Sequence, residues 1–143
     1  MSKKIEKKFI YSGFGFPVEL SDVEMIKIAD SFHPKIDVRK LANSVIESLI
    51  TQKTRFTGNQ IKFIRTYFSM SLREFSKVVN ESHTAIMKWE KFADKPTNMD
   101  INIEIMLRLY ICDRVTMKNK NLKNDFYNQY RKVTEIFHPL ITS

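Results

Sequence analysis

Two helix start signals stand close together in the middle of the chain, and they constrain its fold more than any other feature. Ser71 is followed by Glu74 at the spacing of a capping box, and Ser82 can cap a second helix. Only Asn80 and Glu81 separate the helix predicted for residues 72–79 from that second cap. Two helices joined by so short a turn must cross steeply, as in a helix-turn-helix unit.

The second of these helices, predicted from residue 83 to about 91, divides its side chains between two arcs at about 100° per residue. Ala85, Ile86 and Trp89 share one arc, which is typical of a face packed on a core, so we interpret Trp89 as structural. This division suits a helix that lies in the major groove of DNA and reaches base edges. The opposite arc carries polar, cationic and methionine side chains: His83, Thr84, Met87, Lys88 and Lys91.

Basic residues are dense around this pair of helices. A capping box of Thr57 and Gln60 predicts a further helix just before them. Residues 53–77 hold six basic residues and one acidic residue, and the whole chain has a net charge of +8. This charge favours a polyanionic partner, either nucleic acid or an acidic protein surface. We expect four cations to contact DNA phosphates: Lys62, Arg65, Arg73 and Lys77.

The stretch from Ser71 to Glu90 resembles the helix-turn-helix of Xre/Cro-type regulators. The framework positions of that family fall on Ser71, Glu74, Phe75, Val78, Ser82, Ile86, Trp89 and Glu90. The resemblance implies a compact, lambda-repressor-like DNA-binding domain ending near Val115. It places the base-contacting positions at His83, Thr84, Met87 and Lys88, and we include Ser82 and Lys91 at the two ends of the helix. Two positions depart from the family pattern: Leu72 replaces a common glutamine, and Asn80 replaces a turn glycine.

A second resemblance reaches beyond this unit. Residues 11–18 together with residues 57–65 are similar to bacterial antitoxin-type regulators of the HigA and MqsA kind. The zinc-binding cysteine pairs of MqsA-type antitoxins are absent, so the likeness concerns the DNA-binding half. It implies an autoregulating antitoxin of a toxin–antitoxin pair.

The remaining segments complete the expected architecture. Two or three short strands are predicted between Phe9 and Ala29, with a turn at Ser21-Asp22, and residues 31–34 interrupt that pattern. Apolar spacing predicts helices from Asp37 to about residue 50, over 100–115 and over 118–137. We therefore expect a mainly α fold. Its parts are strands and a helix in residues 1–56, the helix-turn-helix domain in 57–116, and an extra C-terminal helix in 117–143.

Several kinds of chemistry are not predicted. Cys112 is the only cysteine, so no intrachain disulfide can form, and a reducing compartment, the cytoplasm, fits this best. No histidines or cysteines stand at the spacing of metal ligands, and no nucleophile elbow or phosphate-binding glycine loop occurs. No run of 18 uncharged apolar residues is present. We expect no enzyme activity, no cofactor, no metal and no membrane segment.

Three hypotheses about function follow from the sequence. The first is a repressor that binds an operator in double-stranded DNA as a homodimer, acting as an autoregulating antitoxin. The second is a protein-interaction module, in which residues 9–30 and the C-terminal segment bind a toxin and DNA contact is secondary. The third is a phage-type or stand-alone regulator without a toxin partner.

Overall fold

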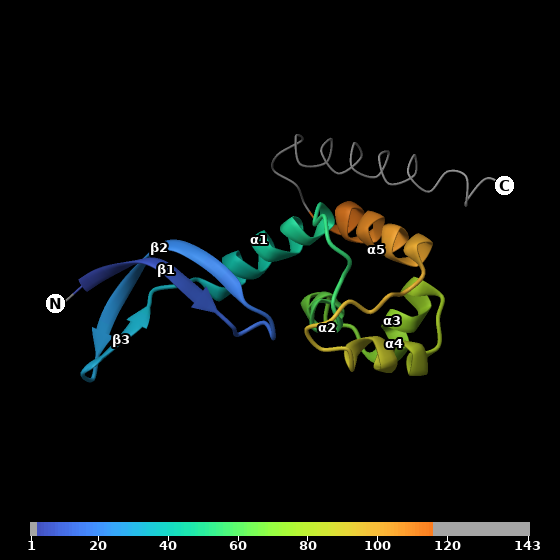
Figure 1. Cartoon of the computed structure of the whole chain (residues 1–143), viewed down its shortest axis with the longest axis horizontal. Helices are drawn as coiled ribbons and strands as arrows, with labels where there is room; N and C mark the ends of the chain where they lie inside the picture. The colour runs from blue at the N-terminus through green and yellow to red at the C-terminus, as the bar shows by residue number, and fades with distance from the viewer. Residues whose placement is uncertain (1–2, 116–143) are drawn as a thin grey trace.

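A computed structural model describes residues 3–115 of the 143-residue chain (Figure 1). Its sheet lies at one end of the molecule, one helix leads away from the sheet, and the other helices gather at the far end (Figure 1). The C-terminal helix predicted for residues 118–137 lies outside the described residues. In chain order the elements are β1 (Lys3–Tyr11), β2 (Val18–Ile28), β3 (Ser31–Pro34), α1 (Val38–Ile50), α2 (Gly58–Tyr67), α3 (Leu72–Val79), α4 (His83–Glu90) and α5 (Ile101–Arg114).

The expectation of a mainly α fold with a small β element is wrong. Helices account for 47% and strands for 22% of the described residues, so the fold is mixed α/β. The three strands form one antiparallel sheet in the order β1-β2-β3, with β1 paired to β2 from Lys3 opposite Ile26 to Tyr11 opposite Val18. The sequence did not predict the start of β1, because this part is rich in lysine. Lysine is uncommon within strands but is favoured on exposed edges.

The predicted turn at Ser21-Asp22 is also wrong. Glu6 pairs with Val23 and Lys8 with Ser21, so β2 keeps its register past Asp22. The chain reverses later, at residues 29 and 30, where both φ angles are positive, at 48° and 67°. Positive φ at both central residues is what a two-residue type I′ turn requires. Residues 31–34, expected to interrupt the pattern, form β3.

In the described part of the chain, one hydrophobic core joins the helices and crosses the predicted boundary between residues 56 and 57. The loop between β1 and β2 attaches the sheet to this core, because the rings of Phe14 and Phe16 lie 5.0 and 5.5 Å from that of Phe63 in α2. Fully buried core side chains come from every helix: Ile46, Ile50, Ile61, Ile64, Phe75, Ile86, Leu107 and Ile111, together with Phe56 in the connector between α1 and α2, residues 51–57.

Candidate nucleic-acid interface

The helices α3 and α4 begin at the residues that the sequence predicts. The Ser71 hydroxyl accepts a hydrogen bond from the N–H of Glu74 at 3.1 Å, and the Glu74 carboxylate accepts one from the N–H of Ser71 at 3.3 Å. The Ser82 hydroxyl accepts one from the N–H of Ala85 at 3.1 Å. These bonds satisfy backbone donors that a helix start leaves unpaired, and they confirm both predicted caps.

The turn between α3 and α4 depends on Asn80. This residue has φ 54° and ψ 46°, in the left-handed region. The following N–H, that of Glu81, donates to the carbonyl of Ser76 at 3.0 Å and closes the end of α3. Asparagine tolerates this conformation better than most residues. This explains how Asn80 can replace the turn glycine of the Xre/Cro-type pattern.

The two faces of α4 differ sharply in exposure. Ile86 is 0% and Trp89 is 9% exposed, and both belong to the hydrophobic core, which confirms the predicted core face. The side chains on the predicted outer arc are all exposed, with Met87 at 43%. These residues are His83, Thr84, Met87, Lys88 and Lys91, and the N-cap residue Ser82 is exposed as well.

Three of the four predicted phosphate contacts, Lys62, Arg73 and Lys77, are exposed on α2 and α3. Arg65 differs, because its guanidinium donates to the Glu90 carboxylate at 2.9 and 3.0 Å and to the carbonyl of Met70 at 3.1 Å. The hydrogen bonds to Glu90 raise the pKa of Arg65 above its ordinary value, while burial opposes that rise. The charge of Arg65 is therefore balanced inside the fold.

The sequence did not predict a buried ion cluster formed by Arg55, Glu104 and Arg108. Glu104 on α5 is 2% exposed and accepts hydrogen bonds from the N–H of Phe56 at 2.8 Å and from Nε of Arg55 at 2.9 Å. Arg108 lies 3.5 Å from the same carboxylate and donates to the carbonyls of Leu49 and Ile50 at the end of α1, at 3.1 and 3.3 Å. The cluster ties α1, the connector and α5 together.

Two physical features describe this cluster further. Burial lowers the pKa of Arg108, while Glu104 opposes the shift, and the guanidinium of Arg108 lies 4.3 Å from the centre of the Phe56 ring.

One sequence signal could have revealed the cluster. Glu104 shares a helical face with Leu107 and Ile111 at the three- and four-residue spacing of a core stripe, and an acidic residue there needs a buried partner.

The six basic residues between positions 53 and 77 therefore fall into two groups. Arg55 and Arg65 hold elements together through carboxylates, and four cations remain on the surface. These exposed cations are Lys53, Lys62, Arg73 and Lys77.

Two other kinds of feature are not found between residues 3 and 115. In this part of the chain, no group of three or more His, Cys, Asp or Glu residues is placed to hold a metal ion. Likewise, none of the helices described there combines the length and the apolar character needed to cross a membrane.

Comparisons with protein-family models, with curated proteins and with solved structures give no match for this chain.

Proposed function

We propose that the protein is a sequence-specific transcriptional repressor that binds double-stranded DNA and reads its operator with α4. The observation that carries this proposal is the contrast between the buried Ile86 and Trp89 and the exposed opposite face. His83 and Thr84 supply hydrogen-bonding groups in the first turn of α4, where a recognition helix meets base edges. Met87 offers an apolar surface for a thymine methyl group.

Phosphate contacts would hold α4 in the groove. Lys62, Arg73 and Lys77 are exposed on the two helices that precede α4, so they can meet the DNA backbone on either side of it. In this proposal Arg65 has a structural role and does not contact a phosphate, because Glu90 already balances its charge. One recognition helix reads only a few base pairs, and we therefore propose a homodimer on a two-fold symmetric operator.

We further propose that this repressor is a cytoplasmic antitoxin that regulates its own operon and is not an enzyme. The support is the similarity of residues 11–18 and 57–65 to antitoxin-type regulators, together with the single cysteine of the chain. Finding a small toxin reading frame beside the gene would favour this role. A neighbourhood of phage genes favours the phage-type regulator instead.

A second candidate function, a protein-interaction module, is favoured by the sheet. Ile5 is 67% and Ile28 is 57% exposed there, and such apolar exposure on a sheet suits a protein partner. Co-expression of the neighbouring reading frame with the full chain and with an Ile5→Asp variant tests this. Equal retention of the partner by both proteins would exclude this part of the sheet as the binding surface.

The DNA proposal is tested by selecting the preferred site from random duplexes and measuring the affinity of variants for it. We expect His83→Ala, Thr84→Ala and Lys88→Ala each to weaken binding by about 1–3 kcal/mol, because each removes a contact to a base edge. Lys40→Ala, an exposed cation on α1, is the matched control, and melting curves check folding. Wild-type affinity in all three variants would remove α4 from the recognition role.

A further inference from the structure

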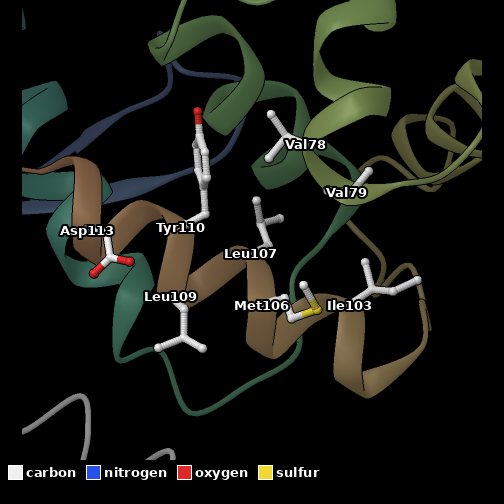
Figure 2. Close-up of a pocket in the computed structure, with 8 residues that line it drawn as sticks. All are labelled: Val78, Val79, Ile103, Met106, Leu107, Leu109, Tyr110 and Asp113. Atoms are coloured by element: carbon white, nitrogen blue, oxygen red, sulfur yellow. The ribbon is translucent and has the colours of Figure 1, made fainter.

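An apolar groove lies between α3 and α5, on residues that the proposed DNA contact does not use (Figure 2). Leu107 and Tyr110 point from α5 toward the side on which Val78 of α3 lies (Figure 2). Val79, Ile103 and Met106 extend the apolar lining, and Asp113 adds one carboxylate. Met106 is 66% exposed, so a large apolar side chain faces outward on this helix.

The lining of α5 has the pattern of a helix-packing surface. At about 100° per residue, Ile103, Met106, Tyr110 and Asp113 fall within an arc of about 80°. Between its first and last members this stripe is about 15 Å long at about 1.5 Å per residue. A continuous stripe of this kind accepts the apolar face of another helix.

The chain beyond α5 contains a matching sequence pattern. Five apolar or aromatic residues between positions 122 and 137 would share one arc of about 80° if that segment is helical. From first to last, they would extend about 22 Å, which is enough to cover the α5 stripe. These residues, outside the described part of the chain, are Leu122, Phe126, Tyr130, Val133 and Phe137.

The length of the connection favours an occupant from the same chain. Only residues 116–121 separate Val115, the C-cap of α5, from Leu122. Connections of about 2–8 residues between helices of a bundle join antiparallel neighbours. Residues 118–137 also hold five basic and two acidic residues, which complement the carboxylate of Asp113 on the groove.

We propose that residues 118–137 bind the groove between α3 and α5 as an amphipathic helix antiparallel to α5. This proposal is independent of DNA binding. Val78 and Val79 lie at the end of α3, directly before the turn at Asn80. In this proposal the bound segment stabilises α3, the helix that precedes α4. Residues 118–137, outside the DNA-binding unit, would then contact the same chain.

Hydrogen exchange of the full-length chain, followed by mass spectrometry, tests the proposal. We expect Met106→Asp to speed exchange in residues 118–137 by at least about tenfold, equivalent to about 1.4 kcal/mol, because a buried charge would expel the segment. Val38→Asp, at an exposed apolar residue in the first turn of α1, is the matched control and should leave that exchange unchanged. Identical exchange of the segment in wild-type protein and the Met106→Asp variant would overturn the proposal.

A cross-linking experiment distinguishes the chain's own segment from other occupants. A photoreactive phenylalanine analogue at position 106 is incorporated into unlabelled protein, which is mixed with ¹⁵N-labelled chains before illumination. We expect cross-links only to residues 118–137 of the same unlabelled chain. Cross-links to labelled chains would show that a second copy fills the groove, and absence of cross-links to the segment would also contradict the proposal.

Discussion

Arg65 and Glu90 meet through two parallel hydrogen bonds of 2.9 and 3.0 Å, and this pair fixes α2 against α4. Their side chains are 18% and 15% exposed, so the contact is largely shielded from water. A third bond from the same guanidinium reaches the carbonyl of Met70, in the loop between α2 and α3. One side chain thereby positions the candidate recognition helix and the segment that leads into α3.

Glu90→Gln should lower the free energy of unfolding by about 1–3 kcal/mol. The amide keeps the shape of the side chain but leaves the partly buried Arg65 without its opposite charge. Chemical denaturation of the full chain measures the change. Lys88→Gln, an exposed position on α4, serves as the control and should stay within about 0.5 kcal/mol of wild type. A stable Glu90→Gln protein would show that the pair adds little to the fold.

Glu104→Gln should be more destabilising, by about 2–4 kcal/mol, because Arg108 is 11% exposed and depends on this carboxylate. The substitution also weakens the acceptor of the Phe56 N–H at the connector. Thermal and denaturant unfolding measure the loss, with Asp94→Asn in an exposed loop as the control. Equal stability of these two variants would contradict the structural role of the cluster.

Gly58→Ala should destabilise the protein by about 1–3 kcal/mol through overpacking. A Cβ at residue 58 would lie 2.4 Å from the carbonyl oxygen of Trp89 and 2.7 Å from the backbone nitrogen of Ala93, so the start of α2 must move away from the end of α4. Gly13→Ala is the matched control, because the three atoms nearest its added Cβ all belong to the side chain of Tyr11, whose ring can move. The expectation fails if both variants melt at the same temperature.

The affinity for the operator should fall steeply as salt concentration rises. Each cation on a phosphate releases counterions, so Lys62→Ala, Arg73→Ala and Lys77→Ala should each reduce the slope of log K against log salt by about one unit. Lys27→Ala, an exposed cation on β2, should leave the slope unchanged. Titrations at several salt concentrations give the slopes, and a salt-independent affinity would refute phosphate contact.

The complex with DNA should contain two copies of the chain on a two-fold symmetric site. Half-sites centred about 34–36 Å apart, one turn of DNA, let two copies of α4 enter successive major grooves on one side. Light scattering of the complex gives the number of chains, and the selected duplex gives the spacing. A single chain on the best site would contradict this expectation.

The helices around the candidate interface could be predicted from local signals in the sequence. The caps of α2 and α3 are read from pairs of residues three positions apart, the cap of α4 from Ser82, and the buried face of α4 from the spacing of Ile86 and Trp89. Such signals are local, because a capping side chain bonds to its own helix and helical periodicity divides the faces before any partner is present. The turn at Asn80 is likewise a local signal, because it depends on the conformational preference of one residue.

The first strand and the buried ion pairs could not be predicted in this way, because they depend on contacts between distant parts of the chain. β1 depends on its pairing with β2, which overrides the weak strand preference of lysine. Arg55 meets Glu104 across 49 positions and Arg65 meets Glu90 across 25, so spacing along the chain predicts neither pair. An arginine on a helix surface looks the same in sequence whether it binds a phosphate or a carboxylate, and the distinction arises only when distant elements pack together.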